Sequence, residues 1–208
     1  MALFDVGGVL VNTRPNPADI AQIFGFDAQD HGSISLVDHA MWAHRDDYDK
    51  GCTDKEFWDR VAGDCGLGEI EEHTLQRLID TDTERMKIAS PFTVEAVRTL
   101  HESGITCGIL SNAPHAIAQA IRATQWFNTY FSFAVFSAEI GVCKPHRAIY
   151  RSALEKLNIP PKNVLFIDDR QENLRGAELL GMSTLLWDGS EESREILQRY
   201  GHTATSEI

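Results

Sequence analysis

Residues 2–11 read ALFDVGGVLV, a short apolar run that is broken by one acid, Asp5, and by a pair of glycines. Similar runs, rich in β-branched residues, leucine or phenylalanine, follow at residues 105–110, 133–137, 164–168 and 183–187. Because none of these runs alternates polar and apolar residues, they predict strands of a parallel sheet that is covered on both faces.

Amphipathic helical patterns separate the later runs, at residues 93–103, 113–124, 146–157 and 172–180. This alternation of strand and helix predicts an α/β fold with a doubly wound, Rossmann-like parallel sheet. Residues 16–87 differ, because they contain only helical patterns, which indicates a helical cap inserted over one edge of the sheet. We therefore divide the chain into an α/β core of residues 1–15 and 88–208 and a helical cap of residues 16–87.

The amino-acid composition excludes some classes of binding partner. The 208 residues carry a formal net charge of −12 and no run of basic residues, which argues against binding to nucleic acid or to an anionic membrane. No apolar stretch approaches the roughly 18 residues of a membrane span, and the N-terminus lacks a basic leader. The 4 cysteines form no C-x-x-C pair. We expect free thiols and a cytoplasmic protein.

Polar residues lie at the predicted carboxyl ends of four of these strands. They are Asp5, the pair Ser111 and Asn112, Lys144 a few residues beyond the third run, and the pair Asp168 and Asp169. Since the carboxyl ends of parallel strands meet at one edge, these side chains should cluster there, where an unpaired buried charge would otherwise cost several kcal/mol.

Such a cluster suits phosphate chemistry. Carboxylates from two strand ends can hold Mg²⁺, and a lysine can neutralise a phosphoryl group. A hydroxyl and backbone N–H groups near Ser111 and Asn112 suit phosphate oxygens, while Asp5 could attack phosphorus and form an aspartyl-phosphate. The alternative is that these residues only cap turns and helices. Gly7 and Gly8 allow a sharp turn next to the metal.

Four motifs in order resemble those of the haloacid dehalogenase-like (HAD) hydrolases: FDVGGVL, ILSN, KP and IDDRQENLRGA. The resemblance covers the whole chain, with a cap of the C1 type, and is greatest to the branch of sugar phosphatases and the epoxide-hydrolase phosphatase domain. It implies that Asp5 is the nucleophile. Metal ligands would be Asp5, Asp169 and the backbone carbonyl of Gly7, whereas Ser111, Asn112 and Lys144 would bind phosphate, with Lys144 also catalytic.

Gly7 departs from the family pattern, which usually has a second Asp at this position as general acid/base. Loss of such a group typically costs about 10²- to 10⁴-fold in rate. Three outcomes stay open: a cap residue such as His44, Asp46 or Asp47 substitutes, the enzyme is slow, or the chain binds ligands without turnover.

We therefore expect a Mg²⁺-dependent phosphohydrolase for a small phosphorylated metabolite. A 2-haloacid dehalogenase is the alternative, since a halide leaves without a proton, although family dehalogenases typically have an aromatic residue at the position of Gly7. Arg14 and the cluster of residues 42–48 either face the substrate or are exposed to solvent. The sequence leaves monomer and dimer equally open.

Overall fold

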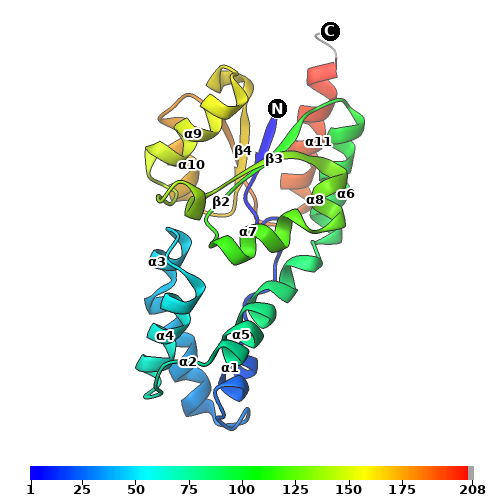
Figure 1. Ribbon diagram of the computed structural model, residues 1–208. Coiled ribbons are helices and arrows are strands. Elements are labelled where there is room, and N and C mark those ends of the chain that lie inside the picture. The colour runs from blue at the N-terminus through cyan, green and yellow to red at the C-terminus, as the bar shows by residue number, and fades with distance from the viewer. Residues whose placement is uncertain (206–208) are drawn as a thin grey trace.

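The computed structural model describes residues 1–205 and places a single parallel sheet in that range. Its strands are β1 (Ala2–Phe4), β2 (Cys107–Ser111), β3 (Phe131–Phe136), β4 (Leu165–Asp168) and β5 (Ser183–Leu186). They lie in the order β3-β2-β1-β4-β5 (Figure 1). The chain builds from β1 to β3 on one side and then crosses to β4, so the switch in strand order lies beside β1. The predicted doubly wound sheet is confirmed.

The first apolar run is only partly strand. β1 ends at Phe4, and beyond it the N–H groups of Leu10 and Val11 donate to the carbonyl of Val6 at 2.9 and 2.8 Å. Gly8 has a φ of +77°, which a residue with a side chain rarely adopts. The strand predicted in this run ends at Phe4, beside Asp5, and the residues after it form a tight turn that satisfies its own backbone hydrogen bonds.

Helices cover both faces of the sheet. One face is covered by α6 (Pro91–Glu102), α7 (His115–Arg122), α8 (Gln125–Tyr130) and α11 (Glu191–Thr205), and the other by α9 (Arg147–Leu157) and α10 (Gln171–Glu178). The side chains of Ala2 and Phe4 pack in the first core and that of Leu3 in the second. The three central strands β1, β2 and β4 are thus buried on two faces, which explains their apolar sequences, whereas the edge strands β3 and β5 are partly exposed.

A second group of helices stands apart from the sheet, beyond the end toward which β1 runs (Figure 1). It consists of α1 (Pro17–Ile23), α2 (His31–Ala43), α3 (Arg45–Asp49), α4 (Asp54–Asp64) and α5 (Glu72–Glu84), followed by the 3₁₀ turn η1 (Arg85–Lys87). These helices share their own core, which includes Phe57, Trp58 and Leu78. We call them the cap helices; the exact boundaries of residues 16 and 87 remain a prediction.

Local signals account for some helix ends and not for others. Thr53 caps α4 through a reciprocal capping box with Glu56, as its sequence predicts. No separate helix was predicted at α3, α8 or α11. The five-residue α3 is too short for an apolar pattern and is held by its packing. No helix among residues 1–205 combines the length and apolar character that crossing a membrane requires.

Candidate active site

Three neighbouring strands bring the predicted polar residues to one place. Asp5 follows β1, Ser111 ends β2 and Asp168 ends β4. β1 lies between β2 and β4, with Phe4 paired to Ile109 on one side and Ile167 on the other. Because the three strands are parallel and in register, their carboxyl ends meet beside Asp5.

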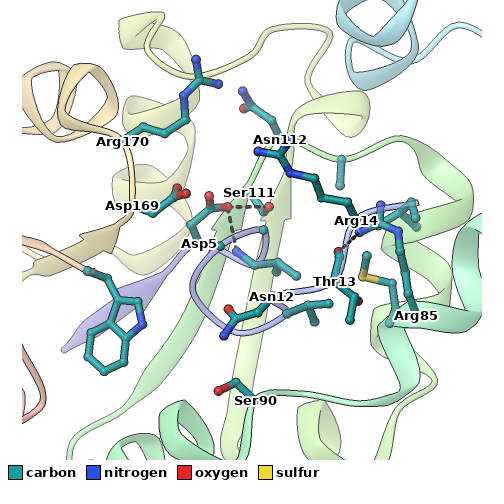
Figure 2. A pocket seen from close by; sticks show the side chains of 18 of the residues that line it. Asp5, Asn12, Thr13, Arg14, Arg85, Ser90, Ser111, Asn112, Asp169 and Arg170 are labelled. Carbon is teal, nitrogen blue, oxygen red and sulfur yellow. Dashed lines mark hydrogen bonds between the residues drawn. The ribbon is translucent and has the colours of Figure 1, made fainter. Parts of the chain in front are cut away.

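The Asp5 carboxylate is buried and held through one oxygen. Its Oδ1 accepts hydrogen bonds from the backbone N–H of Val6 and from Ser111 Oγ, each at 2.7 Å (Figure 2). Lys144 Nζ lies 3.0 Å from the same oxygen. Among the described residues none hydrogen-bonds to Oδ2, so this oxygen is left for a ligand. Burial raises the pKa of Asp5 to about 6, although the Lys144 ammonium acts in the opposite direction.

Lys144 is a buried cation between two carboxylates. Its Nζ donates to Asp168 Oδ2 at 2.7 Å and to the carbonyl of Leu110 at 3.0 Å. Burial alone would lower its pKa, but the charges of Asp5 and Asp168 outweigh burial, so the pKa of Lys144 is raised above its usual value. The lysine is therefore charged at any ordinary pH.

Backbone and side-chain amides hold both Asp168 and the backbone of Lys144 in position. Asn173 Nδ2 donates to both oxygens of Asp168, at 2.9 and 3.1 Å, and the N–H of Arg170 donates to Asp168 Oδ1. Asn112 binds both the N–H and the carbonyl of Lys144, at 2.7 and 3.1 Å. Asp168 thus serves to position the lysine, and Asn112 holds the lysine's backbone in place.

A group of three carboxylates fits a divalent cation. Asp5, Asp168 and Asp169 each offer an oxygen, and these oxygens lie within 4.8 Å of one another. Burial and the neighbouring Asp168 raise the pKa of Asp169, as expected for negative charges gathered at one point. Since Asp168 is used by Lys144, Asp5 and Asp169 remain to bind a hard cation such as Mg²⁺, which prefers oxygen ligands.

The two glycines of the turn differ in their surroundings. A Cβ on Gly8 would come within 2.2 Å of Asp169 Oδ2, so the backbone needs glycine there to pass beside the carboxylate. A Cβ on Gly7 would meet no atom within 4 Å, and Gly7 is exposed to the cleft. The structure therefore leaves room at position 7 for the acid that the sequence lacks.

A cleft of about 850 Å³ extends from this group of residues to the cap helices. Gly7, Ser111, Asn112, Lys144 and Asp169 line it together with Asp5. Ser111 has one donor hydrogen, which goes to Asp5, so it could donate to a phosphate oxygen only by exchanging that bond. The phosphate-binding roles of Ser111, Asn112 and Lys144 remain predictions.

The cap candidates separate into two groups. Trp42, Arg45 and Asp46 line the cleft. His44 instead lies 2.8 Å from Asp64, and Asp47 lies 3.1 Å from Arg60. Neither His44 nor Asp47 lines the cleft, so of the three proposed substitutes for an acid/base only Asp46 faces it.

Four charged residues of the cleft were not singled out from the sequence, namely Asp49, Arg85, Arg170 and Asp188. Asp49 pairs with Arg45 at 2.9 Å, and Arg85 donates to the carbonyl of Thr13 at 3.2 Å. Burial raises the pKa of Asp49 despite its arginine partner. No sequence signal marks Asp49 or Arg85, because their positions depend on how the cap helices pack on the linkers.

A comparison with protein families agrees with the geometry. The model of the haloacid dehalogenase-like hydrolases matches residues 1–181. The chain belongs to this family. It is therefore a hydrolase, and the resemblance seen in the four motifs is confirmed.

Relatives of this HAD-like hydrolase have different activities. It is 30% identical to bifunctional epoxide hydrolase 2 of Sus scrofa over 61% of this chain and 23% of that protein. It is 27% identical to an (S)-2-haloacid dehalogenase of Pseudomonas putida over 54% of this chain and 48% of that enzyme. The chain thus spans less than half the length of either relative.

Solved structures share the fold. A HAD family enzyme from Bacteroides thetaiotaomicron, in complex with magnesium and inorganic phosphate, has a TM-score of 0.67 and 23% sequence identity to this HAD-like hydrolase. The match covers 91% of this chain and 94% of that chain. The likeness extends over both the sheet and the cap helices.

Proposed function

We propose that this HAD-like hydrolase is a Mg²⁺-dependent phosphohydrolase that acts on a small phosphorylated metabolite. The observation that supports this most is the meeting of the Asp5, Asp168 and Asp169 carboxylates within 4.8 Å, beside the buried Lys144. A related structure of the same fold holds both magnesium and phosphate. Nucleic acid and membrane surfaces do not fit a chain with a net charge of −12.

Asp5 and Asp169 would hold the metal, together with the backbone carbonyl of Gly7. When bound, Mg²⁺ supplies positive charge that offsets the repulsion between a carboxylate nucleophile and a phosphate dianion. Lys144 adds a second positive charge, held in place by Asp168. The fold fixes the charge of Lys144 before the substrate arrives, which lowers the cost of reorganisation during the reaction.

The covalent step belongs to Asp5. A carboxylate oxygen of Asp5 attacks phosphorus, the bond from phosphorus to the ester oxygen breaks, and an aspartyl-phosphate forms. A water molecule then attacks phosphorus of the aspartyl-phosphate, which releases inorganic phosphate and restores the carboxylate. The departing alkoxide needs a proton in the first half, and the water must lose one in the second.

Proton transfer is where this chain departs from its family, since Gly7 has no side chain. Asp46 faces the cleft from α3 and has no ion pair among residues 1–201, whose side chains the structure describes. We propose that Asp46 transfers these protons in place of the residue at position 7.

Dehalogenation is the second candidate, because an (S)-2-haloacid dehalogenase is among the relatives. In that reaction Asp5 would attack carbon and a halide would leave without a proton, so Gly7 would be no handicap. However, attack on carbon requires no metal, which would leave Asp169 without a role. We therefore favour phosphate ester hydrolysis.

The test is release of phosphate with and without Mg²⁺ from p-nitrophenyl phosphate and from a panel of phosphorylated metabolites. We expect turnover that depends on Mg²⁺ and is abolished by Asp5→Asn. Release of chloride from 2-chloropropionate without phosphatase activity would instead support the dehalogenase. Binding of Mg²⁺ and phosphate without any turnover would indicate a binding module.

A further inference from the structure

Among residues 1–201, the cationic side chains that line the cleft are Arg14, Arg45, Arg85, Lys144 and Arg170. Carboxylates neutralise most of them, in the pairs Arg45–Asp49, Arg85–Asp82, Lys144–Asp5 and Arg170–Glu172. Arg14 is the exception, because no carboxylate of the described residues forms an ion pair with it. Within the described part of the chain, Arg14 is therefore the cation of the cleft that has no carboxylate as an ion-pair partner.

Arg14 lines the cleft as an exposed side chain. It lies in the loop between β1 and α1, and the residue before it, Thr13, is held by the hydrogen bond from Arg85. Figure 2 shows the Arg14 side chain extended in the direction of Asn112. Asn112 adjoins Ser111, which binds Asp5. The guanidinium thus faces the part of the cleft that leads to the nucleophile.

The groups that gather at Asp5 are Lys144 and the candidate metal ligands, not Arg14. Lys144 and the metal ligands already lie at Asp5, whereas Arg14 reaches the cleft from a different loop. A volume of about 850 Å³ leaves room for a substrate body well beyond one phosphate. A guanidinium matches carboxylate and phosphate oxygens in a two-point contact, so an anion is the partner it selects.

Because other side chains of the cleft are acidic, the binding of a second anionic group on the substrate would depend on Arg14. Asp46 and Asp188 also line the cleft, and both are acidic. A second anionic group on the substrate would be repelled by these carboxylates unless a cation met it directly. Removal of Arg14 should therefore abolish or reverse the preference of the cleft for a substrate with a second anionic group.

We propose that the substrate carries a second anionic group, a carboxylate or a second phosphate, which Arg14 binds while Asp5 attacks the phosphate ester. This proposal rests on the phosphohydrolase function proposed above. It narrows the substrate class to phosphorylated acids and bisphosphates of small metabolites.

The experiment compares matched substrates in the presence of Mg²⁺. The first pair is 3-phosphoglycerate and glycerol 1-phosphate, which differ in a carboxylate; the second is fructose 1,6-bisphosphate and fructose 6-phosphate, which differ in a phosphate. The readout is the ratio of kcat/KM within each pair. We expect the wild type to favour the substrate with two anions about tenfold or more in at least one pair, as a charged hydrogen bond would provide. The favoured pair identifies the second anion.

Arg14→Gln should bring the ratio to one or below. The control is Arg77→Gln, since Arg77 is exposed on α5 and does not line the cleft; its ratio should match that of the wild type. Turnover of p-nitrophenyl phosphate without a preference for two anions, or with a preference that survives Arg14→Gln, would overturn this proposal and leave the phosphohydrolase standing. Absence of turnover with every phosphate ester would overturn both.

Discussion

Lys144 Nζ lies 3.0 Å from Asp5 Oδ1, and both groups are buried. This ion pair joins the end of β1 to a loop nearly 140 residues away in sequence, and Asp168 extends it on the other side at 2.7 Å. The lysine therefore supports the structure of the sheet edge as well as the proposed chemistry. Its two effects can be separated by experiment.

Lys144→Met should destabilise the protein strongly. The change leaves the buried carboxylates of Asp5 and Asp168 without their cation, and breaking a buried ion pair from one side costs about 3–5 kcal/mol. We expect this loss in the free energy of unfolding measured by urea denaturation. The matched control is Lys162→Met, an exposed lysine, which should change stability by less than about 0.5 kcal/mol. Equal stability of the two variants would contradict the proposed role of Lys144.

Asp5→Asn should stabilise the metal-free protein at neutral pH. The pKa of Asp5 is raised from 3.8 to about 6 on folding. Between these values the folded state binds more protons than the unfolded state, so stability falls as the pH rises and the loss is complete above pH 6. A shift of this size corresponds to a gain on the order of 3 kcal/mol for the variant at pH 8 and to almost none at pH 4.

Thermal unfolding in a chelating buffer measures this difference. A gain of each kcal/mol should raise Tm by about 2–4 °C in a chain of this length. Added Mg²⁺ should then stabilise the wild type more than the variant, because Asn at position 5 is a weaker ligand than a carboxylate. A variant that is less stable than the wild type at pH 8 without metal would contradict the burial argument.

The site residues at the strand ends were predictable from the sequence because polar side chains there interrupt or end apolar runs. Asp5, Ser111 and Asp168 each follow or end such a run, and parallel strands bring their ends together whatever the loops do. Lys144 was predicted from its place a few residues after the third run, but its contact with both carboxylates depends on the path of the loop after β3.

The cap side of the cleft was much less predictable. Asp46 and Asp47 are adjacent in sequence and of one residue type, yet Asp46 lines the cleft and Asp47 pairs with Arg60. Which of them faces inward depends on the rotation of α3 about its axis, and that rotation is fixed by packing such as the stacking of Tyr48 on Phe57. No periodicity within a five-residue helix carries this information.

Gly7→Asp should increase the hydrolysis of alkyl phosphates. A Cβ at this position meets no neighbour, and the φ of Gly7 does not lie in the left-handed region. The new carboxyl group can therefore enter the cleft and supply the proton that an alkoxide needs. We expect kcat for glycerol 1-phosphate to rise by about tenfold or more, which is the low end of general acid catalysis. Gly7→Ala, which adds the Cβ without an acid, should show no increase.

Gly8→Asp is the positional control for that gain. Its Cβ would lie 2.2 Å from Asp169 Oδ2 on a backbone with a φ of +77°, so the substitution should displace Asp169. Stabilisation by Mg²⁺ in thermal unfolding should be lost in this variant and kept in Gly7→Asp. If Gly7→Asp also lost stabilisation by Mg²⁺, the turn would need glycine at both position 7 and position 8.

Asp46→Asn should separate substrates by their leaving groups. Alkoxides need a proton as they depart, whereas nitrophenolate needs little, so loss of a general acid affects only the alkyl esters. We expect kcat for glycerol 1-phosphate to fall about 10²-fold and kcat for p-nitrophenyl phosphate to stay within about threefold. The matched control is Asp47→Asn, since the Asp47 carboxylate of the wild type pairs with Arg60 and does not line the cleft. This variant should alter neither rate. A combined Gly7→Asp and Asp46→Asn variant should recover alkyl phosphate hydrolysis, because the carboxyl group at position 7 would then supply the proton. Equal losses on both substrates would instead assign Asp46 to substrate binding, and an unchanged enzyme would leave the proton to another group.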